Sequence, residues 1–479
     1  MKRIIIAILS LAALVSCIKE KGDAVSHYIE SVTVSEHENN RLRVCVDVGF
    51  KQSCDYCIKY WKTDDPSTVF VTPTMHTDGG PERATLMFLY AATEYEIEIS
   101  SADGTWATKP LAFRTSSIPS GVTHYSIEKG GTTKVPGYIM QAALRSDGYM
   151  TIADTDGNVL WYEHSQPAGR DYISQYDVLN PLPNQDRIWY LSGYTDDNAD
   201  GKTVLSSNIG CIDFEGKVYC AWSSEKGDSP VPLAHHEIFR MDDGNVMIVN
   251  QVEKTYDLSP IGGEQNTLVV GDGYTIITAD GKIVKQWDIF GELDILEDKY
   301  LNVLRFNWDL VHANSLYIDS EGYYYMSFNR INQIWKINPN SGKVLYRLGE
   351  NGNVAMDASG YPSGVHAVTA LEPDRLLCLD NGIIPGVSRG LIYKVNPETM
   401  IAEVETCVTL PEESASYDRS NVALVNGGET LVFGMTNSKK VIFTDLEGNI
   451  IKQLRSSVAS YRTNYLEELP VKIEHKNSN

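Results

Sequence analysis

The chain has 479 residues, of which 42% are hydrophobic and 10% aromatic, so it is long enough to bury a large core. Its formal net charge is −22 at pH 7, with the acidic residues dispersed along the sequence. Because nucleic-acid binding needs a basic surface, this charge argues against a nucleic-acid partner. No amphipathic helical stretch of useful length stands out, and the sequence favours an all-β protein.

The N-terminus has the features of an export signal. Residues 1–3 (Met-Lys-Arg) are basic, residues 4–15 form an apolar run too short to span a bilayer, and Cys17 ends a bacterial lipobox. We expect a lipoprotein signal peptide over residues 1–16 and a tether over residues 17–25. Acylation of Cys17 would anchor an exported protein to a membrane, in the periplasm or at the cell surface. An ordinary secretory signal with an incidental cysteine is the alternative.

Residues 26–118 alternate apolar and polar side chains, as in residues 41–48, with turns at short intervals. This pattern predicts a small β-sandwich of the fibronectin-III or immunoglobulin type, with a spacer or docking role. Residues 116–121 are the expected linker. Cys54 and Cys57 have CxxC spacing, but no second CxxC and no nearby ligand histidine accompany them. Structural or free cysteines are therefore favoured over a zinc or redox centre.

From residue 119 to residue 479, two series of turns alternate with β-branched and aromatic runs. Successive copies of the first series lie roughly 50 to 65 residues apart, which suits a propeller blade with inserted loops. Its copies contain Gly157, Gly216, Gly281, Gly342, the degenerate Asn396 and Gly448. The second series contains Gly148, Asn184, Gly244, Gly322, Asp374 and Gly428. Two series of six predict a six-bladed β-propeller.

Cys211 and Cys220 flank the turn at Glu215-Gly216 symmetrically. A two-residue hairpin would place them directly opposite each other at a non-hydrogen-bonded pair, where the spacing suits a disulfide. We predict that bridge; a three- or five-residue loop would change the register.

Three histidines stand at the start of a strand in three successive repeats: His236, His312 and His366. The strand that follows the return from the previous blade lines the channel of a propeller, so these imidazoles should converge at one mouth. Counting through each hairpin pairs Arg330 with His312, Asp380 with His366 and Asn250 with His236. Asn314 should lie at the same mouth, although a slip of one residue would turn any of these side chains away.

This set of side chains suits the transfer of a tetrahedral oxyanion group. A near-neutral imidazole can act as nucleophile or proton donor, a carboxylate behind it fixes its tautomer, and arginine offers a planar fork to an oxyanion. Three histidines could equally bind a divalent metal, and each one alone could be structural.

Three motifs surround these residues. They are residues 235–238 (His-His-Glu-Ile), residues 308–315 leading to 327–337, and residues 364–366 leading to 380–382. The motifs resemble those of the bacterial aryl-sulfate sulfotransferases, a family that also carries an N-terminal β-sandwich. The resemblance implies transfer of a sulfuryl group from a phenolic sulfate to a phenolic acceptor, by a ping-pong mechanism through a sulfohistidine and without metal or cofactor.

The resemblance also implies roles for individual residues. His366 matches the nucleophile, while His236, His312 and Arg330 match residues that hold the sulfuryl oxygens and handle the phenol proton. His235 is the alternative to His236. Ala367 follows His366 where the family often has an acidic residue, a departure that concerns rate and acceptor more than reaction type.

Two other functions stay open at this point: a metal-dependent propeller hydrolase or lyase using the histidines as ligands, and a non-catalytic binding propeller. The partners expected for the first function are a phenolic sulfate donor, a phenolic acceptor and, through the lipid alone, a membrane. Assembly as a homodimer is left open.

Overall fold

The computed structural model describes residues 23–144, 148–164, 176–180, 187–194, 206–384 and 386–475. The predicted signal peptide and Cys17 lie outside these residues, as does most of the tether. The regular elements of the described chain are almost all strands, which confirms the all-β class. No helix within it is both long enough and apolar enough to cross a bilayer. Contacts divide the chain into two compact units, one formed by residues up to 119 together with those from 469 onward, the other by residues 120–468.

The first unit contains short helix α1 (Asp23–Tyr28) and two antiparallel sheets. One sheet has the order β1 (Ile29–His37), β2 (Asn40–Phe50), β6 (Gly80–Leu86). The other has the order β34 (Lys472–His475), β4 (Asp65–Val71), β3 (Cys54–Lys62), β7 (Glu94–Ser101), β8 (Leu111–Arg114), with β5 (Met75–Thr77) also paired to β3. Phe50 of β2 packs on Tyr56 of β3 with ring centroids 4.6 Å apart, so the two sheets share a core. The fibronectin-III or immunoglobulin type stays a prediction.

The C-terminal strand corrects one sequence-based boundary. Residues after 468 were expected in the second unit, but β34 pairs with β4 from Lys472↔Val71 to His475↔Thr68. Strand pairing over such a distance in sequence depends on a free sheet edge, which no local pattern reveals.

Cys54 and Cys57 are free thiols on β3. Residues three apart on a strand point to opposite faces, so the CxxC spacing does not bring these two sulfurs together. Cys57 is buried, and its Sγ lies 3.3 Å from Oγ of Ser100. These observations agree with free or structural cysteines.

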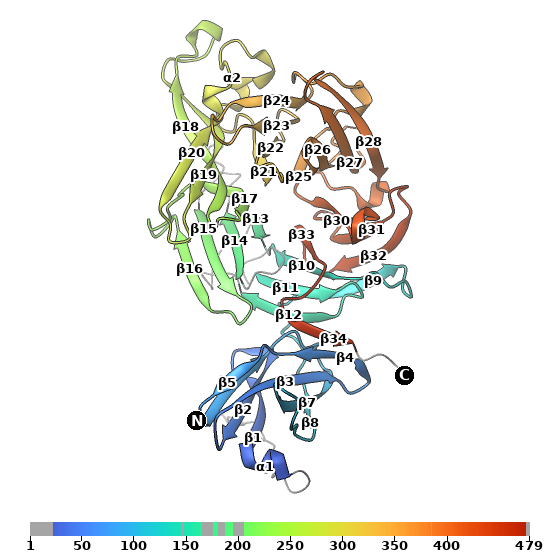
Figure 1. The fold of residues 1–479 in the computed structure, drawn as a ribbon. Helices are drawn as coiled ribbons and strands as arrows, with labels where there is room; N and C mark the ends of the chain where they lie inside the picture. The colour runs from blue at the N-terminus through green and yellow to red at the C-terminus, as the bar shows by residue number, and fades with distance from the viewer. Residues whose placement is uncertain are drawn as a thin grey trace, which may run out of the picture. The chain divides into compact units, whose positions relative to one another are not determined.

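In the second unit, the described residues form six antiparallel sheets of four or five strands (Figure 1). The first sheet has the order β12 (Val159–His164), β11 (Tyr149–Asp154), β10 (Tyr138–Ala143), β33 (Ser460–Leu466). The second has the order β13 (Tyr176–Asn180), β14 (Arg187–Tyr194), β15 (Ser206–Asp213), β16 (Val218–Ser223). The third has the order β17 (Ala234–Arg240), β18 (Val246–Tyr256), β19 (Thr267–Ile277), β20 (Ile283–Asp288).

The other three sheets continue along the chain. The fourth has the order β21 (Ala313–Ile318), β22 (Tyr324–Phe328), β23 (Gln333–Ile337), β24 (Val344–Gly349). The fifth has the order β25 (Val365–Glu372), β26 (Arg375–Asp380), β27 (Arg389–Asn396), β28 (Ile401–Thr409). The sixth has the order β29 (Asn421–Val425), β30 (Thr430–Met435), β31 (Lys440–Thr444), β32 (Ile450–Ser456), β9 (Tyr125–Lys129). A one-turn helix, α2 (Val303–Phe306), precedes β21.

The edge strands β33, β13, β17, β21, β25 and β29 contact one another in turn, β29 meeting β33 again, so the six sheets close into a ring. Figure 1 labels β33, β13, β17, β21 and β25 around the middle of the ring. Closure uses both ends of the unit: β33 pairs with β10, and β9 pairs with β32. The C-terminal strand β33 therefore lies at the inner edge of the first sheet.

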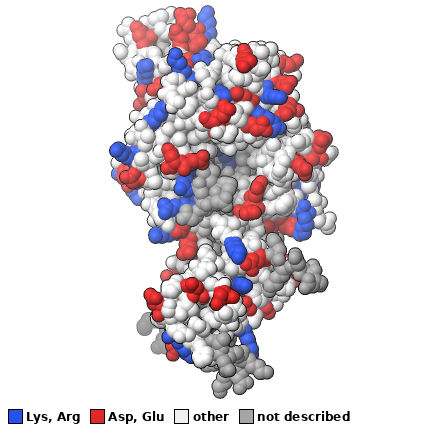
Figure 2. Space-filling view, in the orientation of Figure 1, with Lys and Arg blue, Asp and Glu red and all other residues white. Residues whose placement is uncertain are grey.

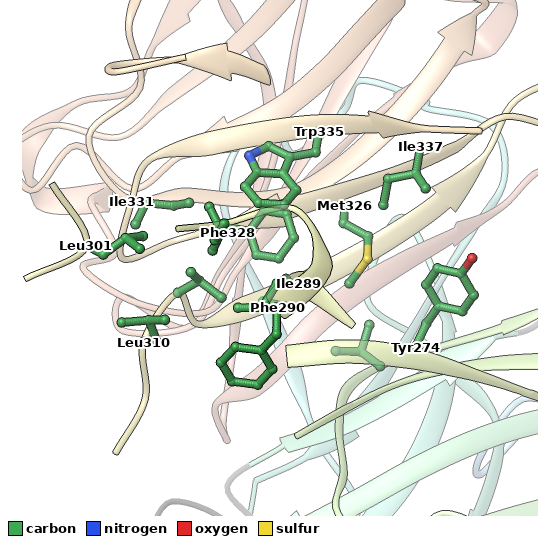
Figure 3. Close-up of a cluster of buried hydrophobic side chains, with 14 of the residues drawn as sticks. Tyr274, Ile289, Phe290, Leu301, Leu310, Met326, Phe328, Ile331, Trp335 and Ile337 are labelled. Atoms are coloured by element: carbon green, nitrogen blue, oxygen red, sulfur yellow. The ribbon is translucent and has the colours of Figure 1, made fainter. Parts of the chain in front are cut away.

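Apolar side chains fill the space between neighbouring sheets. Figure 3 shows such a cluster between the third and fourth sheets, with Tyr274 of β19, Met326 and Phe328 of β22, and Trp335 of β23. Trp335 is fully buried and packs on Phe328 with ring centroids 4.6 Å apart. Because close packing resists small displacements, this cluster fixes the position of β21 relative to β17.

Acidic and basic side chains are intermixed on the visible face in Figure 2, without a block of either sign. This distribution agrees with the dispersed acidic residues of the sequence.

The predicted pairing of Cys211 with Cys220 is correct, but the disulfide is not present. The two residues are direct neighbours on β15 and β16, and both are free thiols. The turn is also longer than the expected two residues, because residues 214–217 connect the two strands. A register shift lies between Cys211 and Ile212, next to this turn. Direct opposition alone does not form a bond, which also requires the two sulfurs to meet at a defined dihedral angle.

Candidate active site

The three predicted histidines lie at irregular points where the first strand of a sheet begins. His236 has a positive φ of 61° and sits where pairing of β17 with β18 shifts, between Ala234 and Ile238. His312 has φ 55° and directly precedes β21. In β25 the register shifts just after His366, where Ala367 has φ 53°. Such bulges bend a strand and re-aim its side chains.

The bulges bring the imidazoles together. The rings of His236 and His312 meet edge to face, with centroids 4.9 Å apart. The ring of Tyr461, on β33, lies between those of His236 and His366. Its centroid is 5.9 Å from that of His236 and 5.6 Å from that of His366. One cluster thus draws on the third, fourth, fifth and first sheets of the ring.

A buried carboxylate joins His312 to Arg330. Asp309 Oδ2 lies 2.7 Å from Nδ1 of His312 and accepts a hydrogen bond of 2.7 Å from Nη2 of Arg330. Burial alone would lower the pKa of His312, but the charge and hydrogen bond of Asp309, together with the charge of Asp272, outweigh burial and raise this pKa above its ordinary value. Burial favours the neutral form of Asp309, yet its two cationic partners hold its pKa below the ordinary value.

Arg330 is held against aromatic rings as well. Its guanidinium carbon lies 4.2 Å from the centroid of Phe306 and 4.9 Å from that of Trp308, which are cation–π distances. Its Nε is buried without a hydrogen-bond partner among the described residues. The group is therefore fixed in place and retains an unused donor.

His366 is 3% exposed, and its Nε2 lies 3.1 Å from the hydroxyl of Tyr461. Burial is the main cause that holds the pKa of His366 well below its ordinary value, and the positive charge of Arg462 adds to it. The buried Nδ1 has no well-aligned hydrogen-bond partner among the residues that the structure describes, although the nearby backbone of Ser420 opposes the shift. A proton on Nδ1 would leave the lone pair on Nε2, the nitrogen that faces the cluster.

His235 and His236 have different surroundings. His235 is buried behind the cluster, with Nε2 3.1 Å from Oδ1 of Asp272 and Nδ1 2.8 Å from Nδ1 of His236. His236 is the one that contacts His312 and Tyr461. Burial lowers the pKa of His236 well below its ordinary value, and the neighbouring imidazoles lower it further. The geometry therefore favours His236 as the group that meets a substrate, with His235 orienting it.

Two predicted neighbours are wrong. Asp380 is opposite Val365 rather than His366. Its Oδ2 accepts hydrogen bonds of 2.8 and 2.6 Å from Arg389. Its Oδ1 accepts hydrogen bonds from two backbone amides. Asn250 is opposite Ala234 rather than His236, and its Oδ1 accepts from Thr275. In both hairpins a bulge shifts the register that symmetric counting about the turn had assumed.

Asn314 supports the site rather than lining it, because its side chain is fully buried. Its Nδ2 donates to the carbonyl of Val365 at 2.9 Å, and its Oδ1 accepts from Ser327 at 2.5 Å. The hydrogen bond from Asn314 to Val365 ties β21 to the residue before His366.

Arg330 lies one residue away from its predicted position opposite His312, because its backbone amide donates to the carbonyl of Val311. The carboxylate of Asp309 nevertheless joins Arg330 to His312.

Sequence reasoning missed four residues of the cluster: Asp309, Glu237, Tyr461 and Arg462. Asp309 and Glu237 both lie in the motifs, and Asp309 could have been proposed as the partner of His312. Tyr461 and Arg462 follow the last repeat, and only ring closure by β33 places them at the centre.

The arrangement combines a neutral imidazole with fixed cations. His366 offers a lone pair, His312 offers a proton, and the guanidinium of Arg330 can donate hydrogen bonds to an oxyanion. No group of three or more His, Cys, Asp or Glu in the described part of the chain is arranged to hold a metal ion.

The comparisons with known proteins identify one family. The family model described as Arylsulfotransferase (ASST) matches residues 125–405. No curated protein matches the chain. Among solved structures, a protein of unknown function from Bacteroides caccae has a TM-score of 0.43 and 10% identity, covering 70% of this chain and 100% of that chain.

Two further solved structures are enzymes. The periplasmic gluconolactonase of Pseudomonas aeruginosa has a TM-score of 0.40 and 11% identity, covering 69% of this chain and 99% of its own. The inactive virginiamycin B lyase of Staphylococcus aureus has a TM-score of 0.32 and 13% identity, covering 70% of this chain and 99% of its own. At these scores the likenesses support no conclusion about this chain.

Proposed function

Because the chain belongs to the arylsulfotransferase family, we propose that it moves a sulfuryl group from a phenolic sulfate ester to a phenolic acceptor, with His366 carrying the group between two half-reactions. The matched segment contains His236, His312, Arg330 and His366. The observation that carries the proposal is the position of the buried His366, whose pKa is lowered, in one cluster with His312, whose pKa is raised.

We propose that the six sheets of the second unit are the blades of a six-bladed β-propeller, and that the first unit is a fibronectin-III or immunoglobulin-like sandwich. The ring of edge strands and the interlocked ends support the first assignment. The shared core of two antiparallel sheets supports the second.

In the first half-reaction, the hydroxyl of Tyr461 releases its hydrogen bond to Nε2 of His366, the lone pair on Nε2 attacks sulfur, and the bond between sulfur and the phenolic oxygen breaks. The departing phenoxide takes the proton of His312, and the sulfuryl group remains on His366. In the second half-reaction the acceptor phenol returns a proton to His312 while its oxygen attacks sulfur, and the N–S bond breaks. Each half-reaction therefore ends with protons and electrons balanced.

The equatorial sulfuryl oxygens need fixed donors during both transfers. Arg330 is pre-organised for this role by Asp309 and two aromatic rings, so little reorganisation is needed when charge develops. His236 is the second group placed to contact these oxygens.

Arg330→Lys should lower turnover by at least about tenfold, which corresponds to ~1.4 kcal/mol of transition-state stabilisation. Lysine keeps the positive charge but loses the planar fork and the stacking on Phe306 and Trp308. Steady-state rates with a chromogenic aryl sulfate and a phenol measure the change. Unchanged turnover would remove Arg330 from the site.

The proposed function itself is tested by acceptor dependence. The purified protein should turn over a chromogenic aryl sulfate only when a phenol is present. Acceptor-independent turnover that is lost with a chelator and restored with zinc would favour a metal-dependent hydrolase or lyase. Absence of turnover across a panel of aryl sulfates and phenols would favour a non-catalytic binding protein.

We also propose that the protein is an exported lipoprotein anchored through Cys17. The lipobox and the apolar segment before it support this proposal. Cys17→Ser should abolish incorporation of a labelled fatty acid and release the protein from membranes, because it removes the acylated thiol. Cell fractionation measures the release. A Cys17→Ser protein that stays fully membrane-bound would contradict the anchor.

A further inference from the structure

We propose that Arg462 is a positioning residue for sulfuryl transfer, and that it holds the segments carrying His236 and His312 to each other at the centre of the ring, next to Tyr461, which contacts His366. This inference rests on the proposed function. Arg462 lies on the closing strand β33, beyond the segment that the family model matches.

Arg462 bonds to residues next to or near His236 and His312, and the adjacent Tyr461 contacts His366. Its Nη1 donates to Oε2 of Glu237, the residue after His236. Its Nη2 donates at 2.5 Å to the carbonyl of Asn314, two residues after His312. The preceding residue, Tyr461, places its hydroxyl 3.1 Å from Nε2 of His366. Three strands from three different sheets therefore meet at two consecutive residues of β33.

The charge of Arg462 is unusual for its position. Its side chain is 10% exposed, that of Glu237 is 9% exposed, and Nε of Arg462 is buried without a hydrogen-bond partner in the described part of the chain. Buried ion pairs contribute little to stability, because desolvation of both charges offsets their attraction. A positioning and electrostatic role accounts for a buried guanidinium better than stability does.

The second effect of Arg462 is on protonation. Titratable and charged groups surround His366 from every neighbouring element: His236 of β17, His312 before β21, Arg419 before β29, and Tyr461 and Arg462 of β33. After burial, Arg462 is the largest influence that lowers the pKa of His366. A neutral His366 is the form that attacks sulfur, so loss of this cation should move the acid limb of the first half-reaction to higher pH.

Arg462→Gln removes the charge and alters both contacts. Burial raises the pKa of Glu237. Without Arg462 this carboxyl should therefore take up a proton, so that no unpaired negative charge is left near His366. We expect the phenol burst to slow by about tenfold or more and its acid limb to shift upward in pH. Arg462→Lys keeps the charge and changes the geometry, so its burst should slow while its acid limb stays near that of wild type.

The experiment is a stopped-flow measurement of burst rate against pH, with an aryl sulfate and no acceptor, on the full chain. Arg83→Gln is the matched control, since Arg83 bonds to Asp47 on the exposed face of the first unit. Thermal unfolding of each variant checks folding. A folded Arg462→Gln protein with the wild-type burst rate and acid limb overturns the proposal.

Tyr461→Phe provides the deciding variant if Arg462→Gln does not fold, because it removes only one hydroxyl. Its burst should be slower than wild type at every pH, since His366 loses its orienting hydrogen bond. A Tyr461→Phe burst equal to wild type, together with an unaltered Arg462→Lys burst, overturns the proposal as well. Absence of any burst in wild type would instead refute the proposed sulfohistidine function.

Discussion

Incubated with an aryl sulfate and no acceptor, wild-type protein should release about one phenol per active site, and His366→Asn should release none. A ping-pong enzyme stalls after its first half-reaction because the sulfuryl group has no acceptor. Asparagine has no basic nitrogen, so no N–S bond can form. The burst amplitude and an acid-labile mass increase of one SO3 on the peptide containing His366 are the two measurements.

Variants of the neighbouring histidines control for general damage to the site. His312→Asn and His236→Asn should slow the burst without moving the adduct to another peptide, because their side chains assist the transfer but do not carry the group. Chelators should leave the burst unchanged. A burst that survives in His366→Asn would refute the sulfohistidine mechanism, and zinc-dependent activity would favour the metal alternative.

Asp309→Asn should lower turnover by about a hundredfold or more, the range in which a positioned proton donor acts. Asp309 holds both His312 and Arg330 at 2.7 Å, so one substitution loosens the proton donor and the oxyanion fork together. The asparagine is close in shape, so the packing around it should persist. Thermal unfolding of the variant tests that assumption.

The pH dependence separates this effect from simple misfolding. The negative charge of Asp309 raises the pKa of His312, which keeps the proton donor charged to higher pH. Without that charge the pKa falls, so the alkaline limb of kcat should move to lower pH and the loss should be greatest at high pH. A loss of equal size at every pH would indicate that Asp309 acts through structure alone.

Much of the fold follows from local patterns in the sequence. Alternating side chains and turn residues specify strands and hairpins because both properties depend on neighbours in the chain. This information was sufficient for the all-β class, for the direct opposition of Cys211 and Cys220, and for the histidines at the start of strands. It also brought Arg330 back beside His312, with an error of one residue.

The neighbours of the histidines could not be read from these patterns. Bulges beside His236 and His366 displace the pairing, so Asn250 and Asp380 turn to other partners. A bulge changes register by one or two residues, and the turn that follows it does not encode this change. Symmetric counting therefore fails where the backbone is bent to aim a side chain.

Ring closure decided the rest of the site. Tyr461 and Arg462 lie about a hundred residues after His366, and they reach it only because β33 pairs with β10. The sequence by itself determined the strands, the repeat and the histidines, since each depends on short-range periodicity. The tertiary structure alone decided which side chains surround them, because that depends on the bulges and on the way in which the last strand meets the first sheet.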